Sequence, residues 1–174
     1  MSSQPRALYV HIPFCLRRCD YCGFVSSVYR QETADAYLQA LSREIERRAI
    51  GQCEPRTIYI GGGTPTCLSI AQLTRLLDIL AALPLQGIEE WTIEANPNTL
   101  TTEKIILLKE RGINRVSLGI QAFHARGLRA LGRAQDNRKI KAVVAQLREM
   151  GMDNISSLAL CEIHAFLGVA TFLS

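Results

Sequence analysis

The sequence contains no run of 18 apolar residues, although 48% of its 174 residues are hydrophobic. Since a membrane-spanning helix needs about 20 such residues, none is predicted. Aromatic residues make up only 6%, and the 20 basic residues are dispersed against 16 acidic ones. Arg43, Arg47 and Arg48 alternate with Glu44 and Glu46, which is typical of a solvated helix face. A nucleic-acid partner is therefore not expected.

A targeting segment is also missing from the first residues, Met-Ser-Ser-Gln-Pro-Arg. They lack the apolar core of a secretory signal and the long Arg- and Ser-rich stretch of a transit peptide. We therefore expect a soluble, cytoplasmic protein whose six cysteines stay out of disulfides. A chain of this length is sufficient for one domain with its own hydrophobic core.

Three cysteines stand together near the N-terminus, Cys15, Cys19 and Cys22, with the spacing Cys-x3-Cys-x2-Cys. Thiolates at this spacing can bind three irons of a cube-shaped iron–sulfur cluster and leave the fourth iron free for a small molecule. Zinc is an alternative, but it needs a fourth ligand, and His11 lies on a predicted strand in a poor position to supply one. Disulfides are a further alternative. The remaining cysteines are scattered: Cys53, Cys67 and Cys161.

Short apolar runs alternate with longer stretches of helical periodicity. Strands are predicted at Ala7–His11, Thr57–Ile60, Glu90–Ala95, Asn114–Gly119 and Ile155–Leu160. Helices are predicted at Thr33–Ala49, from the cap Ser69 to Ile79, from the cap Thr101 to Lys109, at His124–Ala130 and at Asn137–Met150. This alternation indicates βαβ units with right-handed crossovers and a parallel sheet.

Polar or glycine-rich segments follow four successive predicted strands: the cysteine loop, Gly61–Thr66, Glu94–Pro97 and Gly119–Gln121. If all four lie at the carboxyl ends of strands, they meet at one mouth, as in a barrel. A doubly wound open sheet also fits the alternation. Because a complete eight-unit barrel takes about 250 residues and only five strands are predicted, we expect a partial (β/α) barrel.

Several motifs in the same order resemble the radical S-adenosylmethionine superfamily, over about residues 7–155. They are Leu8–Cys15, the cysteine triplet, Tyr59–Thr66, Glu94–Pro97, Gly112–Gln121 and Leu131–Arg133. Within that superfamily the chain is most similar to the branch that holds HemW-type haem chaperones and oxygen-independent coproporphyrinogen III oxidases. The resemblance implies a partial radical S-adenosylmethionine barrel.

The resemblance also implies a cofactor site. Cys15, Cys19 and Cys22 would bind a [4Fe-4S] cluster whose fourth iron chelates S-adenosylmethionine, and one-electron reduction would release a 5′-deoxyadenosyl radical. The glycine run lets a ligand approach the backbone closely, although a tight turn alone would also need glycine. The matching positions that would contact the cofactor are Tyr9, Tyr21, Gly62, Gly63, Thr64, Glu94, Gln121 and Arg133. No catalytic residue is assigned.

The branch depends on Phe24, because the oxidase pattern has a further cysteine at that position. Phe24 favours a haem chaperone, which implies haem binding and delivery to a haemoprotein acceptor. The alternative is oxidative decarboxylation of coproporphyrinogen III in porphyrin biosynthesis. Whether the chain is an enzyme stays open, and neither the haem acceptor nor the electron donor follows from the sequence.

The resemblance ends near Ile155. We expect residues 1–155 to form the N-terminal part of the core domain and 156–174 a divergent apolar tail, in which Leu158 replaces a cofactor-contacting Asp of the family. Cys161 and His164 are three residues apart, and they are either a pair of metal ligands or incidental neighbours. The expected origin is a truncated product of a frameshift, splice event or gene-model error. A non-functional fragment is a further alternative.

Overall fold

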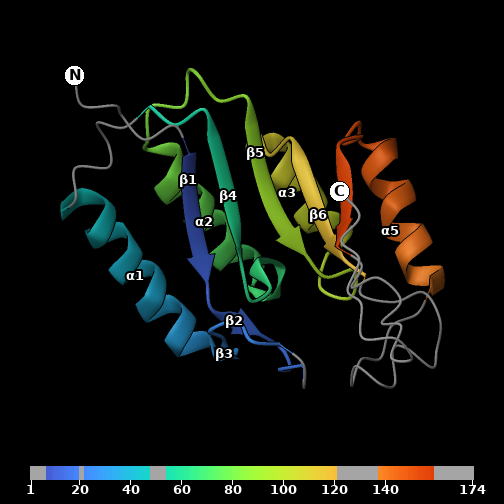
Figure 1. Cartoon of the computed structure of the whole chain (residues 1–174), viewed down its shortest axis with the longest axis horizontal. Coiled ribbons are helices and arrows are strands. Elements are labelled where there is room, and N and C mark those ends of the chain that lie inside the picture. Colours follow the sequence, from blue (N-terminus) through green and yellow to red (C-terminus); the bar gives the residue numbers. More distant parts are fainter. Residues whose placement is uncertain (1–6, 20–21, 48–53, 121–136, 159–174) are drawn as a thin grey trace, which may run out of the picture.

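The computed structural model of the chain describes residues 7–19, 22–47, 54–120 and 137–158. Its main sheet has five strands in the order β1-β4-β5-β6-β7, each parallel to its neighbours (Figure 1). They are β1 (Ala7–Ile12), β4 (Thr57–Gly62), β5 (Glu90–Ala95), β6 (Arg115–Gly119) and β7 (Ile155–Leu158). The predicted sheet of five parallel strands is therefore confirmed.

Four helices accompany the sheet: α1 (Gln31–Arg47), α2 (Ile70–Ala81), α3 (Thr102–Glu110) and α5 (Asn137–Glu149). In Figure 1, α2 and α3 lie behind the sheet, α1 lies beside β1 and α5 beside β7. All five strands run toward the same edge, so the loops that follow β1, β4 and β5 are neighbours there. This is the edge at which parallel α/β proteins place their sites.

The ends of the four predicted helices that fall within the described residues agree with the structure within a few residues, and capping side chains fix the starts of α2 and α3. The Ser69 hydroxyl accepts a hydrogen bond from the Gln72 amide, and the Gln72 side chain accepts one from the Ser69 amide. This reciprocal capping box satisfies two amides at the start of α2. The Thr101 hydroxyl likewise accepts from the Lys104 amide at the start of α3.

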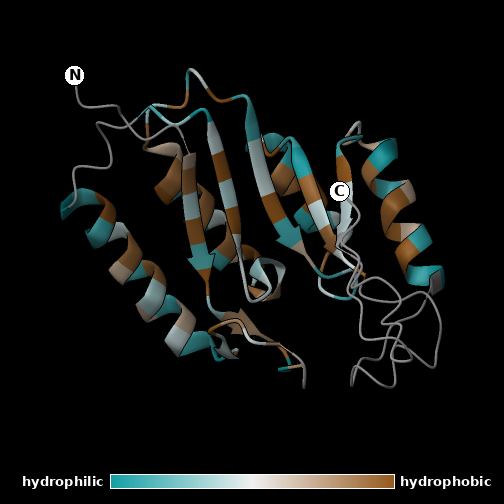
Figure 2. Ribbon diagram, in the orientation of Figure 1, coloured by the Kyte–Doolittle hydropathy of each residue, from teal (hydrophilic) through white to brown (hydrophobic). Residues whose placement is uncertain are grey.

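The two faces of the sheet differ in character. Residues such as Val10, Ile58 and Ile93 point toward the helices and are at most 4% exposed. The side chains between them form a polar row on the open face, where Arg115 makes a paired contact of 3.0 and 2.9 Å with Glu90. The ribbon accordingly alternates between hydrophobic and hydrophilic colours along each strand (Figure 2). The open face of the sheet is therefore polar, and it can accept a polar ligand.

A second, smaller sheet pairs β2 (Phe14–Cys15) with β3 (Ser27–Val28), and a short 3-10 helix, η2 (Pro65–Cys67), follows β4. Neither feature is predicted from periodicity, because each spans only two or three residues. The predicted helix at His124–Ala130, the end of the last strand after Leu158 and the apolar tail lie outside the described residues. None of the described helices combines the length and apolarity needed to span a membrane.

Candidate functional site

A cavity of about 230 Å³ opens at the carboxyl edge of the sheet. Three loops line it: the cysteine loop after β1, the glycine run after β4 and the segment after β5. Six of the predicted site residues share this lining: Cys15, Cys19, Cys22, Gly62, Gly63 and Thr64. The structure therefore brings together the cysteine triplet and the glycine run, which are 40 residues apart in the sequence.

The base of the cysteine loop is held by backbone hydrogen bonds. The Ser27 amide donates to the Pro13 carbonyl at 2.7 Å, and the Tyr29 amide donates to the Cys15 carbonyl at 2.8 Å. The Phe14 ring is 2% exposed and lies edge-on to the rings of Tyr29 and Tyr37. Because a buried aromatic ring and two backbone bonds fix the start of the loop, the position of the first cysteine is well defined.

The thiol of Cys15 lies in a half-buried position and receives hydroxyl contacts. Thr64 Oγ1 donates to Cys15 Sγ at 3.7 Å, and the Ser26 side chain also bonds it. Burial raises the pKa of the Cys15 thiol, these two hydrogen bonds lower it, and the nearby Cys22 and Cys19 thiols raise it. All three thiols line the same cavity.

The donor set fits an iron–sulfur cluster better than a single ion. A structural zinc ion would need a fourth ligand in addition to the three thiols. In a cube-shaped cluster each cysteine binds a different iron, so the thiolates stand farther apart. Three soft sulfur ligands that line one cavity match that chemistry.

His11 is occupied by other contacts. Its Nε2 donates to the Val25 carbonyl at 2.9 Å, so its Nδ1 accepts from the Tyr9 hydroxyl at 3.0 Å. The imidazole therefore ties the end of β1 to the far side of the cysteine loop.

The glycine run is required by close packing against neighbouring residues. A Cβ on Gly63 would lie 2.5 Å from the Phe14 carbonyl oxygen, and one on Gly62 would lie 2.5 Å from the His11 ring. Gly62 also has a φ of +113°, which disfavours any other residue. The Gly63 amide donates to Ile12 and the Thr64 amide to Phe14. Close packing on the cysteine loop thus requires these glycines, and close approach of a ligand stays a prediction.

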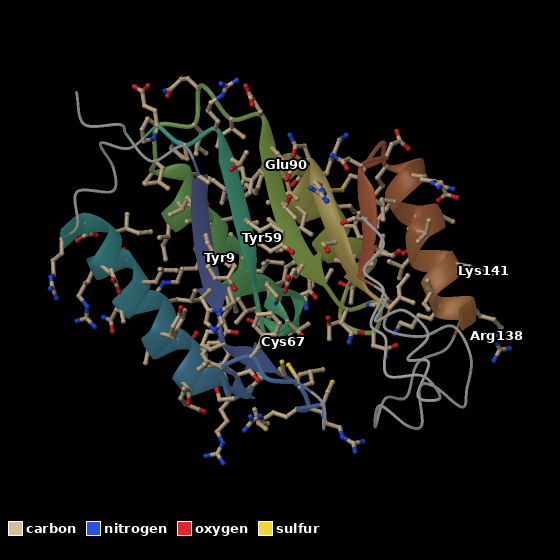
Figure 3. All side chains as sticks on the ribbon, viewed as in Figure 1. Tyr9, Tyr59, Cys67, Glu90, Arg138 and Lys141 are labelled. Carbon is tan, nitrogen blue, oxygen red and sulfur yellow. The ribbon has the colours of Figure 1, made fainter. Side chains whose placement is uncertain are left out.

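Glu94 and Tyr9 lie outside the cavity lining, on the open face of the sheet, and Glu94 contacts the lining at Gly62. The Tyr59 hydroxyl donates to Glu94 Oε1 at 2.7 Å, and the Gly62 amide donates to Glu94 Oε2 at 3.1 Å. The rings of Tyr9 and Tyr59 stack with centroids 6.1 Å apart, side by side on β1 and β4 (Figure 3). Burial, followed by the hydrogen bond to Glu94, raises the pKa of Tyr59 to about 12.

This arrangement makes Glu94 a support for the glycine run. Each carboxylate oxygen has a second acceptor site beyond the bond described, so the carboxylate can still accept from a ligand. Burial, and secondarily the charge of Glu94, also raises the pKa of Tyr9. Both tyrosines therefore stay neutral hydrogen-bond donors at physiological pH. The cofactor contacts expected for Glu94 and Tyr9 stay predictions.

The third wall of the cavity begins in the segment Glu94–Pro97, which was predicted to lie at this mouth, but none of the wall's residues was predicted as a ligand contact. It consists of Asn96, Asn98 and Thr99, which follow directly after β5. A usable signal was present, because polar residues that end a parallel strand belong at the same edge as the cysteine and glycine loops. Arg17 and Arg18 also line the cavity from within the cysteine loop. Three of the predicted contact residues, Tyr21, Gln121 and Arg133, lie outside the described residues.

A family model and several known proteins match most of this chain. The sequence model described as the radical SAM superfamily matches residues 9–163. Heme chaperone HemW of Bacillus subtilis is 39% identical over 155 residues, which is 87% of this chain and 41% of the relative. Oxygen-independent coproporphyrinogen III oxidase of Escherichia coli is 38% identical over 152 residues, covering 85% of this chain and 33% of the enzyme.

Among solved structures, coproporphyrinogen III oxidase (HemN) from Escherichia coli, which is described as a radical SAM enzyme, matches with a TM-score of 0.81 at 37% identity. The match covers 88% of this chain and 36% of the enzyme. The likeness confirms the predicted partial (β/α) barrel. The chain spans about two fifths or less of the length of these relatives.

Proposed function

Because the chain belongs to the radical S-adenosylmethionine superfamily, whose members use a [4Fe-4S] cluster and S-adenosylmethionine, we propose that its edge cavity holds both groups. Cys15, Cys19 and Cys22 would bind three irons of the cluster. The main observation in support is that these thiols line one cavity together with Gly62, Gly63 and Thr64. Glycines carry no side chain, so they leave room beside an open iron for an amino-acid ligand.

Each part of the chain has a definite task in this proposal. The bound cluster supplies the one-electron chemistry that cleaves S-adenosylmethionine. The hydroxyls of Thr64 and Ser26 donate to the Cys15 sulfur, which favours its thiolate form as a ligand. The carboxylate of Glu94 holds the Gly62 amide in place and offers its remaining acceptor sites to the cofactor. Tyr9, Tyr21, Gln121 and Arg133 are proposed as further cofactor contacts.

For the biological role, we propose a haem chaperone, which binds haem and passes it to a haemoprotein. Three relatives named heme chaperone HemW are 37–41% identical to this chain. Phe24 stands where the oxidase pattern has a cysteine, and its side chain is 60% exposed beside the cysteine loop. We propose the cytoplasm as the location, since a thiol-ligated cluster needs a reducing compartment.

Oxidation of coproporphyrinogen III is the second candidate, because the solved oxidase has the same fold over this segment. The two roles are separated by incubating the anaerobically reconstituted protein with haem or with coproporphyrinogen III. A chaperone binds haem with a saturable Soret change and forms no decarboxylated porphyrin. Substrate-dependent formation of 5′-deoxyadenosine together with decarboxylation would reject the chaperone role. If neither haem binding nor turnover occurs, this chain is a non-functional fragment of its family.

A further inference from the structure

Lys104 is a cation behind the cavity that the proposed chemistry does not use. It is the third residue of α3, and side chains at the start of a helix lean back toward the preceding loop. Its Nζ donates to the Thr66 carbonyl at 2.6 Å and to the Thr99 carbonyl at 3.2 Å. The ammonium thus joins the loop after β4 to the loop after β5.

The two loops meet around a buried hydroxyl pair. Thr66 is fully buried and Thr99 is 9% exposed, and their hydroxyl oxygens are 2.6 Å apart. The Asn96 amide donates to Thr66 Oγ1 at 3.2 Å, and the Thr99 amide donates to the Asn96 carbonyl at 2.9 Å. The Thr99 hydroxyl also donates to the Asn96 carbonyl at 3.1 Å, so uncharged hydrogen bonds join the two loops and Lys104 adds a charged donor to them.

The burial of Lys104 has an energetic cost. Desolvation lowers the pKa of its ammonium, an effect that the nearby Cys67 and Glu103 oppose. Its hydrogen-bond acceptors are main-chain carbonyls, which compensate an ammonium less well than a carboxylate would. An apolar side chain of the same length would fill this space without that cost. The charge is therefore best explained by the two loops that it holds together.

Both loops carry cavity-lining residues. Gly62, Gly63 and Thr64 come just before Thr66, whereas Asn96, Asn98 and Thr99 line the cavity from the neighbouring strand's loop. The distance between the walls therefore depends on how closely Thr66 and Thr99 are held. A ligand gripped by both walls would bind more weakly if they separated, because even small displacements weaken well-aligned hydrogen bonds.

We propose that Lys104 is a positioning residue: its ammonium clamps the carbonyls of Thr66 and Thr99 and so sets the separation of the walls that grip S-adenosylmethionine. The clamp does not touch the cofactor. Its effect on affinity rests on the proposed function, but the clamp can also be measured without any ligand.

The test compares K104M, which keeps the length of the side chain but loses the donors, with K104R and K109M. Lys109 offers a matched control, because it lies on the same helix and donates to the Gly151 carbonyl at 2.9 Å, away from the cavity lining. Hydrogen exchange of the ligand-free proteins reports the amides of residues 98–100. Titration of the reduced cluster's EPR signal with S-adenosylmethionine reports the Kd.

We expect K104M and K109M to incorporate iron equally and to unfold at similar urea concentrations. Only in K104M should the amide hydrogens of residues 98–100 exchange faster and the Kd for S-adenosylmethionine rise about tenfold. Charge-assisted hydrogen bonds contribute on this scale. K104R should recover most of the affinity. If K104M fails to fold, K104Q, which keeps one amide donor, replaces it in the comparison.

Equal affinity and equal exchange in K104M and K109M would overturn the clamp. Faster exchange with an unchanged Kd would overturn its link to the ligand. If the wild-type cluster does not respond to S-adenosylmethionine, the proposed function fails instead. In that case the exchange of residues 98–100 still decides the clamp, which is rejected if K104M matches K109M and retained if only K104M loses protection.

Discussion

Replacing Gly63 by alanine should disrupt the contact between the glycine run and the cysteine loop. The new Cβ would lie 2.5 Å from the Phe14 carbonyl oxygen and 2.9 Å from its carbonyl carbon and its amide nitrogen. Ordinary Cβ contacts begin at 3.4 Å, so the two backbones must separate by about 0.9 Å. All three clashing atoms are backbone atoms, which cannot turn aside as a flexible side chain could.

The magnitude follows from what holds Phe14 in place. Its ring is 2% exposed, and its carbonyl accepts from the Thr64 amide at 2.7 Å and from the Cys67 thiol at 3.4 Å. Overpacking a well-filled site costs about 1–3 kcal/mol. Weakening the Thr64 bond adds about 1 kcal/mol. We therefore expect G63A to lower the free energy of unfolding by about 2–4 kcal/mol.

Urea unfolding of the apo chain measures this change, and G87A is the matched control. A Cβ on Gly87 has no atom within 4 Å, so its replacement should stay within about 0.5 kcal/mol of wild type. Iron incorporation by G63A should fall as well, because Phe14 precedes Cys15. The reasoning is refuted if G63A and G87A unfold at the same urea concentration and bind equal iron.

Three further predictions concern the tyrosines and the buried thiol. E94Q and Y59F should each lower the free energy of unfolding of the apo chain by about 1 kcal/mol. The double variant should lose less than the sum, because the two residues share one hydrogen bond. Additive losses of unfolding free energy in urea would contradict this. The pKa of Tyr59 is raised to about 12 in the folded chain, against about 10 when unfolded, so Tyr59 contributes stability below pH 10 that disappears toward pH 12. The stability of Y59F should therefore fall less steeply than that of wild type over this range. Parallel curves of stability against pH would contradict the raised pKa. Burial raises the pKa of Cys67 to about 12, so iodoacetamide at pH 8 should alkylate the three loop cysteines well before Cys67, and equal rates in mapped peptides would count against its burial.

The sheet and its helices were predictable because their signals are long and local. Segments of four to six residues with alternating apolar side chains define the strands, and Ser69 and Thr101 cap their helices through their own hydroxyls. The paired strands Phe14–Cys15 and Ser27–Val28 could not be predicted, since two-residue strands have no periodicity. They depend on contacts between residues more than ten positions apart.

Within the site, the cysteine triplet and the glycine run were predictable from spacing and motif. Their shared cavity followed from the rule that parallel strands end at one edge. The Tyr59–Glu94–Gly62 contacts and the Lys104 clamp were not predictable, because they join residues from different βα units through side-chain geometry. The domain boundary at residue 155 and the origin of the tail stay predictions, while the family match continues to residue 163.

The central claim is that three specific cysteines hold a cluster with an open iron. Anaerobic reconstitution with iron and sulfide, followed by low-temperature EPR, tests it in wild type, C22A and C67A. Cys67 is the control, because it is a fourth thiol near Cys15 but lies outside the cavity lining. Wild type and C67A should bind about four irons per chain and change their reduced signal when S-adenosylmethionine is added, whereas C22A should not. A folded wild type without a cluster, a signal indifferent to S-adenosylmethionine, or equal iron loss in C67A and C22A would contradict the account.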